Sequence, residues 1–435
     1  MFASNAGITI MSIATSTPNS AFLNQMRFAP EQQKIEKLMV TFELETILSH
    51  FEREGGVKSI RDTILSSQLK LTRTMAPRLA TALEEVCAAL QYTEPVDLFV
   101  AENASFNAFA VYSLDQTPHI IVLTSRLIER MNDAEIRFVL GHEIGHLQFR
   151  HYRMQMVPRA FGDNKEGNNK TPSLLQRRLE IWQRLAELSA DRAGFVAAAG
   201  NLNSVVSVFF KIASGLGPEH LHFDISAFLA QLEELQQLER RDSLCDFSHP
   251  SIPIRVKALQ MYRDVGGPNA SSEAIQQIDA AISELAKLME RKPSDPEELH
   301  KLNYILAGGM LVGHSDDQGL GHIEMQAFIE MLLPLTSDPE EAIASITTVA
   351  QAEEMFAASA AWMRENTGEL KFNGFRYLAI IAALEGMTPG EEALLYRMAE
   401  MTGIPRKAAA DLIHEILTSF ASKKVPGGNL IQKLR

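Results

Sequence analysis

The chain has 435 residues, of which 46% are hydrophobic, and it carries 41 Lys and Arg against 54 Asp and Glu, a formal charge of -13 at pH 7. This composition is typical of a globular protein with two or three packed domains and excludes a disordered carrier. Because the acidic balance is not interrupted by a long basic patch, nucleic acid is not expected as a partner.

The cysteines and the hydropathy of the chain predict its cellular location. Its two cysteines, Cys87 and Cys245, lie far apart without CxxC spacing, which indicates neither a disulfide framework nor a thiolate zinc site and favours a reducing compartment. No positive charge precedes Arg27, and no apolar run reaches the roughly 18 residues of a membrane-spanning helix. We therefore predict a soluble, cytoplasmic protein without a signal peptide or an integral membrane segment. Nothing in the sequence specifies an oligomeric state.

The N-terminal part of the chain predicts a tail followed by helices. Residues 1–29 are rich in small polar residues without apolar periodicity, which is typical of a flexible tail or of a segment that drapes over the body. From Pro30, apolar residues recur at helical spacing. Helices are predicted over 31–54, near 57–70 and over 76–92.

A small β-sheet and a capped helix are predicted next. Short apolar runs at 96–100, 106–113 and 119–124 predict three strands. Asn132 and Glu135 then form a capping box, so a helix is expected to begin there and to run to about residue 153.

The following region is predicted to be helical around one loop. Residues 162–173 have turn-forming and polar residues without an apolar face, which predicts a mobile loop. Helical periodicity resumes over 174–199, continues in pieces to residue 241 and returns near 272–291.

The segment from Pro293 to Pro296 predicts a linker, and everything beyond it is helical. Two weakly similar units, 302–333 and 375–398, each consist of a helix, a break and a second helix. The second break carries a capping box formed by Thr388 and Glu391. This region resembles the TerB-like (tellurite-resistance) helical domain. We expect no metal in its sparse acidic breaks.

The pentapeptide from His142 to His146 (HEIGH) predicts a metal site. Two imidazoles four residues apart lie one turn apart on the same side of a helix, so both can reach one ion at about 2.0–2.1 Å. Glu143 is offset from them by one residue and can address the ion's water. Apolar neighbours on several sides of this helix argue against a solvated surface pair of histidines.

The third ligand is predicted to come from another helix. A metzincin would need Gly and His three and six residues after His146, where this chain has Phe149 and Tyr152. His151 follows His142 by nine residues, which predicts that it lies on the opposite side of the helix as a structural or exposed residue.

Glu187 and Asp191 are the best candidates on a second helix. They lie four residues apart among small residues, which would let two helices approach closely. We predict that Glu187 is the third ligand and that Asp191 accepts a hydrogen bond from a ligating imidazole. The alternative is an exposed acidic face.

At this point the sequence resembles a known family. Asn107-Ala108-Phe109-Ala110, the HEIGH helix, Glu187-x-x-x-Asp191 and His249-Pro250 with Arg255 follow each other as in the HtpX-like and CAAX prenyl-protease-type zinc metallopeptidases. The resemblance covers about 31–265. It implies one zinc ion per chain held by His142, His146 and Glu187. Glu143 would be the catalytic base, and Asp191 would accept a hydrogen bond from a ligating imidazole.

The resemblance also implies roles for the remaining motifs. The strand around Asn107, Ala108, Phe109 and Ala110 would border the cleft and pair with an extended substrate. His249 and Arg255 would lie near the metal, where either one could stabilise an oxyanion and His249 could instead fill the fourth coordination position and hold the enzyme inactive. An ordinary turn and a surface charge are the alternatives. Many family members carry transmembrane helices, which this sequence does not predict.

The predicted fold is mainly α with a small β-sheet, an α+β zincin-type core, followed by an all-α domain. The predicted domains are the tail 1–29, a metallopeptidase domain 30–291 and an accessory helical domain 297–435. We expect a zinc-dependent endopeptidase that acts on protein or peptide substrates with a zinc-activated water and Glu143, and that is latent or regulated through the accessory domain. The alternative is a scaffold protein of a stress response in which cleavage is absent or rare.

Overall fold

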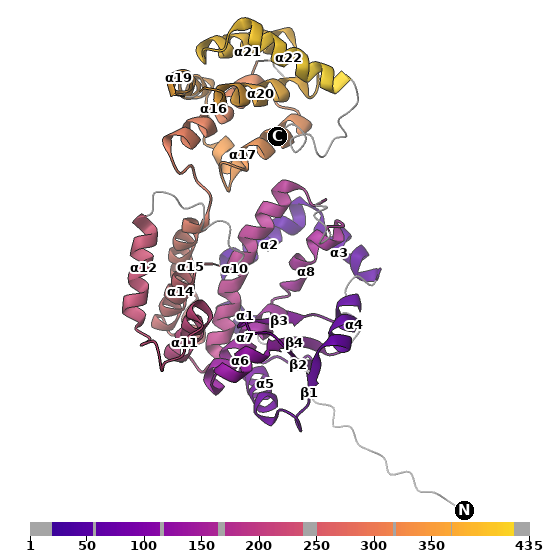
Figure 1. The fold of residues 1–435 in the computed structure, drawn as a ribbon, viewed down its shortest axis with the longest axis vertical. Coiled ribbons are helices and arrows are strands. Elements are labelled where there is room, and N and C mark those ends of the chain that lie inside the picture. The colour runs from indigo at the N-terminus through magenta and orange to yellow at the C-terminus, as the bar shows by residue number, and fades with distance from the viewer. Residues whose placement is uncertain are drawn as a thin grey trace, which may run out of the picture. The chain divides into compact units, whose positions relative to one another are not determined.

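A computed structural model describes residues 20–54, 58–113, 117–163, 170–237, 250–315, 319–366 and 368–421 (Figure 1). The chain divides into two compact units. The first comprises Met1–Ala160, Trp182–Leu232 and Ser251–Leu285, and the second comprises Phe161–Ile181, Glu233–Pro250 and Ala286–Arg435. The predicted fold class is confirmed, because the described residues are mainly helical around one small sheet.

The first unit contains a four-stranded sheet with the order β1-β2-β4-β3. Its central strands β2 and β4 are parallel, and β1 and β3 pair with them in antiparallel fashion at the two edges. The strands are β1 Leu69–Leu71, β2 Val96–Ala101, β3 Ala108–Val111 and β4 His119–Thr124. Three of them were predicted. The short strand β1 was assigned to a helix, because its pairing with β2 is a tertiary contact that local periodicity does not contain.

The helices up to the end of the first unit are α1 Ser20–Met26, α2 Ala29–Thr41, α3 Leu44–Arg53, α4 Lys58–Ser67, α5 Pro77–Ala89, α6 Ser125–Arg130, α7 Asp133–Gln148, α8 Tyr152–Gln155, α9 Val157–Ala160, α10 Ser173–Ala197, α11 Leu202–Ser214, α12 Ile225–Gln237, α14 Ile252–Asp264 and α15 Ser272–Ala286. Short 3-10 turns span Gly267–Asn269 and Lys287–Met289. None of the described helices is both long and apolar enough to cross a membrane.

Near the N-terminus, one predicted helix is divided into two, and part of the predicted tail is helical. The helix expected over 31–54 is divided into α2 and α3, because Glu43 takes a left-handed conformation with φ 50°. Of the segment 1–29, residues from Ser20 onward are described, and they form α1 and the start of α2. Met26 and Phe28 are fully buried there. Residues 1–19 and residues 164–169 of the predicted loop 162–173 lie outside the described residues.

Helix α7 begins at the predicted capping box of Asn132 and Glu135 but ends earlier than predicted. Arg150 is left-handed with φ 58°, its N–H donates to Leu147 O at 3.1 Å, and the N–H of His151 donates to His146 O at 3.0 Å. This pair of bonds is a Schellman motif, which usually has Gly at the left-handed position. With Arg at that position, the sequence gives no signal of the helix end.

Glycines bring α7 and α10 close together. A Cβ atom added to Gly145 would lie 2.8 Å from Ala193 Cβ and 3.2 Å from Ala190 Cα. One added to Gly194 of α10 would lie 2.7 Å from Phe138 O. The two helix backbones therefore approach where no larger side chain fits, as the small residues of the second helix had predicted.

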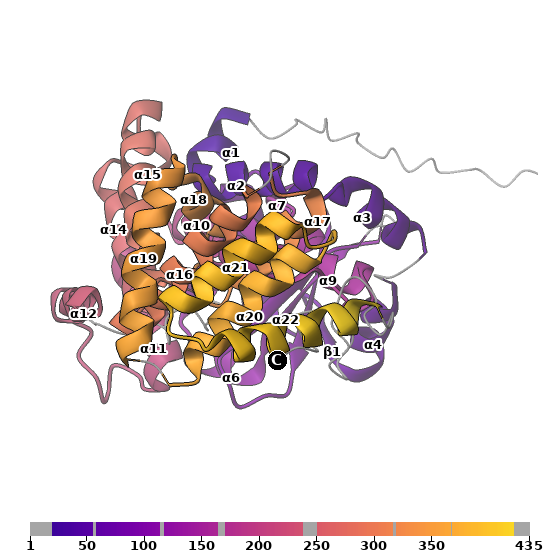
Figure 2. The ribbon, with the colours of Figure 1, turned by 90° about the horizontal axis from the view of Figure 1, so that it is seen from above.

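The second unit contains the helices α16 Pro296–Gly313, α17 His322–Leu332, α18 Pro339–Ala344, α19 Val349–Asn366, α20 Leu370–Ala383, α21 Pro389–Met401 and α22 Arg406–Ala421. Helix α16 packs against α19 and α20, and α20 packs against α21 and α22, as Figure 2 shows from above. Large buried side chains of this core include Tyr304, Phe328, Phe356 and Phe375. The predicted capping box of Thr388 and Glu391 begins α21.

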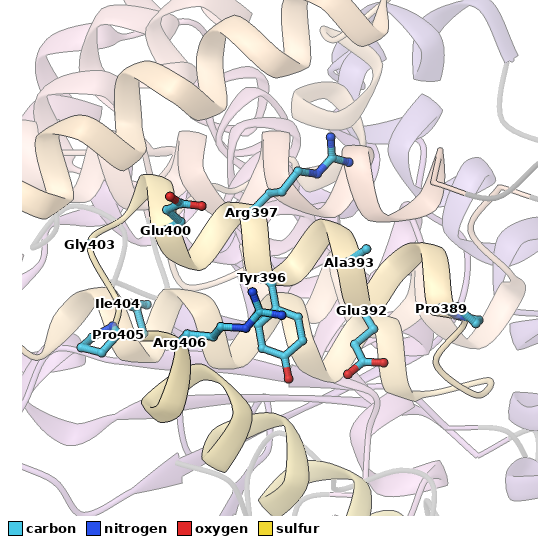
Figure 3. A pocket seen from close by; sticks show the side chains of 10 residues that line it. All are labelled: Pro389, Glu392, Ala393, Tyr396, Arg397, Glu400, Gly403, Ile404, Pro405 and Arg406. Atoms are coloured by element: carbon cyan, nitrogen blue, oxygen red, sulfur yellow. The ribbon is translucent and has the colours of Figure 1, made fainter.

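A surface hollow of this second unit lies along α21 and the start of α22 (Figure 3). The guanidinium of Arg406 lies over the ring of Tyr396, 4.8 Å from its centroid. The hollow is lined by Pro389, Glu392, Ala393, Tyr396, Arg397, Glu400, Gly403, Ile404, Pro405 and Arg406. Its charged side chains are of both signs, so it does not select for a strongly charged ligand.

The close approach of α7 and α10 can be tested by adding one methyl group. We expect Gly145→Ala to lower the free energy of unfolding by about 1–3 kcal/mol, because the new Cβ meets Ala193 Cβ on a rigid helix. The double variant Gly145→Ala, Ala193→Gly should lose less stability than the sum of the two single variants. Urea unfolding of the four proteins measures this, and additive losses would show that the two helices are not in tight contact.

Candidate metal centre

Three side chains from α7 and α10 converge at one point. His142 Nε2 and His146 Nε2 are 3.1 Å apart. Glu187 Oε2 lies 3.5 Å from His142 Nε2, and Glu187 Oε1 lies 3.4 Å from His146 Nε2. Among the described residues, these three form the one group of His, Cys, Asp or Glu with metal-ligand geometry. The structure thus brings together the ligands that the sequence predicted.

The close approach of these side chains is compatible with a zinc ion between them. With zinc bonds of about 2.0–2.1 Å, neighbouring ligand atoms of a tetrahedron lie about 3.3 Å apart. The nearest approaches between the side chains are close to that value, with Glu187 presenting Oε2 to His142 and Oε1 to His146. With one ligand atom per residue, the three atoms lie within 4.8 Å of one another. The chemistry also fits, because burial alone would lower the pKa of His142 but the carboxylates of Asp191 and Glu187 raise it to about 10. The two carboxylates therefore favour a positive charge at this point.

His142 is held from behind by Asp191. Its Nδ1–H donates to Asp191 Oδ1 at 3.0 Å, so Nε2 is the nitrogen that faces His146 and Glu187 and at which a bound metal would replace a proton. Burial would raise the pKa of Asp191, but the guanidinium of Arg255 and the bond from His142 lower it. Asp191 is therefore an ionised acceptor in the interior.

Arg255 on α14 neutralises this carboxylate. Its Nε donates to Asp191 Oδ2 at 2.7 Å and its Nη2 to Asp191 Oδ1 at 2.6 Å, while Nη2 also lies 3.4 Å from Glu187 Oε2. The guanidinium stacks over Phe209, 4.7 Å from the ring centroid. Burial would lower the pKa of Arg255, but Asp191, Glu187 and Glu143 raise it above its usual value. The sequence predicted that Arg255 lies near the metal, not that it binds Asp191.

His146 has a different partner, His151, which the sequence analysis predicted as a structural or exposed residue on the opposite side of the helix. His151 is fully buried, and its Nδ1 lies 2.8 Å from His146 Nδ1. The prediction assumed that the helix continued. Because the Schellman motif ends α7 at Gln148, the chain turns back and places His151 behind His146. Burial lowers the pKa of His151 to about 4, so its ring is neutral near pH 7.

Behind His151 lies Glu31, a fully buried carboxylate of α2. Its Oε1 is 3.6 Å from His151 Nε2. Glu31 accepts hydrogen bonds from Arg27 Nε at 2.8 Å, from Trp182 Nε1 at 2.9 Å and from Ser189 Oγ at 3.3 Å. Burial would raise the pKa of Glu31, but His151 and Arg27 lower it far below its usual range. Glu31 carries no signal of this role in the sequence, because a single Glu in the first turn of a helix is typical of an exposed charge.

Glu143 and strand β3 complete the neighbourhood of the three ligands. Glu143 is buried on α7, adjacent in sequence to His142, and its charge acts on Arg255. Helix α7 contacts β3. This strand contains Ala108, Phe109 and Ala110, follows Asn107, and lies at the sheet edge with Phe109 39% exposed. His249 lies outside the described residues, so its predicted place is not tested.

Comparison with known proteins gives the family of this region. Residues 74–263 match the family described as Peptidase family M48. An Arabidopsis thaliana protein named plastoglobule-localized metallopeptidase 48, chloroplastic, is 28% identical over 214 residues, 45% of this chain. Two Streptococcus pyogenes proteins named protease HtpX homolog are 33% and 32% identical over 84 residues, 19% of this chain.

The similarity covers part of each relative. The chain spans 59% of the length of the Arabidopsis protein and 28% of each streptococcal protein. No solved structure is significantly similar to the chain. The matched range contains His142, His146, Glu187, Asp191 and Arg255 but not Glu31.

The buried pair of Asp191 and Arg255 predicts a large loss of stability when one partner is removed. We expect Arg255→Ala to destabilise the metal-free protein by about 3–5 kcal/mol, because Asp191 keeps a buried charge without its counter-ion. Arg263→Ala on the same helix is the control, since Arg263 pairs with exposed Asp264 and should cost less than about 1 kcal/mol. Equal unfolding midpoints in urea would contradict this assignment.

Proposed function

We propose that this chain, whose residues 74–263 form a domain of peptidase family M48, is a zinc-dependent endopeptidase acting on protein or peptide substrates. The observation that carries the proposal is the convergence of His142, His146 and Glu187, in which each side chain approaches the other two to 3.1–3.5 Å. A buried Glu143 next to the first ligand supports catalysis rather than storage of the ion.

The residues would divide the hydrolysis of a peptide bond between them. His142, His146 and Glu187 hold the ion, which supplies Lewis acidity to the substrate carbonyl and to a water molecule. Glu143 accepts the proton of the attacking water and passes it to the leaving amine, so that a carboxylic acid and an amine result. Asp191 keeps His142 in the tautomer that leaves Nε2 free for the ion.

The edge strand β3 is the proposed binding site for an extended substrate. Its one paired side faces β4, and helix α7 of the ligands contacts it. A substrate strand added there would receive backbone hydrogen bonds, with Asn107, Ala108, Phe109 and Ala110 alongside. Sequence-independent backbone pairing of this kind suits an endopeptidase of unfolded segments.

The remaining roles stay predictions. Since two nitrogens of Arg255 bind Asp191, we assign this residue first to positioning, while its predicted oxyanion role and the roles of His249 await a test. Regulation by the helical domain 297–435 is likewise a proposal. The cytoplasmic location predicted from the sequence also stays a prediction, because the Arabidopsis relative is named for the plastoglobule of the chloroplast.

The catalytic assignment predicts that Glu143→Gln retains the fold and the metal but loses activity. We expect cleavage of unfolded casein by the zinc-loaded protein and a rate lower by about 10²–10⁴-fold in the variant, because the proton acceptor is gone. New peptides are measured by mass spectrometry, with a chelator control. If zinc is bound but neither protein cleaves, the scaffold function or a latent enzyme is favoured instead.

The ligand assignment predicts a different effect for Glu187→Ala. Removal of a zinc ligand should weaken zinc binding itself, whereas Glu143→Gln should leave the affinity near that of the wild type. Glu180→Ala, two turns earlier on α10 where Glu180 pairs with Arg177, is the matched control. Competition with a chromophoric chelator measures the four affinities, and equal affinity of the wild type and Glu187→Ala would exclude Glu187 as a ligand.

A further inference from the structure

The two imidazole ligands differ in what lies behind them. His142 faces a carboxylate, Asp191, but His146 faces a second imidazole, with 2.8 Å between His146 Nδ1 and His151 Nδ1. At this distance one nitrogen donates and the other accepts. With Nε2 of His146 turned to the ion, its Nδ1 carries the proton. His151 must then accept at Nδ1 and carry its own proton on Nε2.

The proton on His151 Nε2 faces Glu31. The distance from Nε2 to Glu31 Oε1 is 3.6 Å, and both side chains are fully buried. A carboxylate at this place favours the His151 tautomer protonated at Nε2, because the positive end of that N–H points toward it. The opposite tautomer would place two N–H groups against each other between His146 and His151.

Glu31 itself is fixed by three donors. Arg27 binds both of its oxygens, at 2.8 and 3.0 Å, and Trp182 and Ser189 of α10 donate to it. The N–H of Phe28 donates to Ser189 Oγ at 3.0 Å, which ties the start of α2 to α10. The carboxylate is therefore attached to the same helix that supplies Glu187.

We propose that Glu31 and His151 are positioning residues of the zinc site, which orient His146 as Asp191 and Arg255 orient His142. The inference rests on the proposed function, because it takes the ion bound by His146 to be zinc. It extends the site to the N-terminal segment, since Glu31 lies outside the range 74–263 that matches the family. Such partners typically change metal affinity or activity by about 10–100-fold when removed.

The chain offers a matched control for a purely structural effect. Asp279 is another buried carboxylate that binds an arginine, Arg192, and accepts a hydrogen bond from Ala29 N at 3.0 Å. It holds the same N-terminal segment as Glu31 but contacts no imidazole among the interactions described for it. Asp279→Asn therefore reproduces the loss of a buried charge without changing the contacts of Glu31, His151 and His146.

The experiment compares the full-length wild type with Glu31→Gln, His151→Phe, His151→Asn and Asp279→Asn. Zinc affinity is measured by chelator competition, and the cobalt-substituted proteins are compared by visible absorption, which reports the geometry of the ligands. Thermal unfolding of each metal-free protein checks the fold. We expect Glu31→Gln and His151→Phe to bind zinc about 10–100-fold more weakly and to alter the cobalt spectrum.

His151→Asn should recover most of the lost affinity, because its amide oxygen can replace Nδ1 as the acceptor for His146. Asp279→Asn should keep the wild-type affinity and spectrum even where it lowers the unfolding temperature. Wild-type affinity in Glu31→Gln and His151→Phe, or an equal loss in Asp279→Asn, would overturn the inference. If Glu31→Gln does not fold, the zinc affinities of the two His151 variants decide whether the inference holds. A wild type that binds no zinc would instead refute the proposed function.

Discussion

The close approach of α7 and α10 is the constraint on which the site depends. Gly145, inside the HEIGH motif, and Gly194 leave no room for a Cβ atom between the two helices. At this separation the imidazoles of one helix and the carboxylate of Glu187 on the other come within 3.5 Å. The three predicted ligands are thus brought together by the packing of the two helix backbones.

Burial of charge is the second condition, and two buried charges beside the site have partners of opposite sign. Asp191 is paired with Arg255, and Glu135 at the start of α7 is paired with Lys211 at 2.7 Å. An isolated ion in this interior would cost several kcal/mol, so each pair also fixes one element beside α7 or α10. The first unit is therefore held together around the site by ion pairs between distant segments, in addition to its apolar core.

The convergence of the three predicted ligands could be predicted from the sequence, but their surroundings could not, for physical reasons. His142, His146 and Glu187 follow from helical spacing, which is a local property, and the capping box at Asn132 and Glu135 is equally local. The end of α7 was not predictable, because Arg150 occupies a left-handed position at which Gly is usually found. Glu31 could not be predicted as the partner of His151 for another reason, since more than a hundred residues separate the two in the sequence and only the tertiary fold brings them together.

Arg255 comes much later in the sequence than Glu31 and Asp191, and this order has a consequence for the newly made chain. Domains fold as units while synthesis proceeds from the N-terminus. Until Arg255 has left the ribosome, Asp191 lacks the guanidinium that makes its burial tolerable, although the HEIGH helix is already complete. The ligand set can therefore reach its final geometry only late in translation. For the endopeptidase proposed above, the order in which the residues emerge would keep a growing chain from cutting itself or its neighbours.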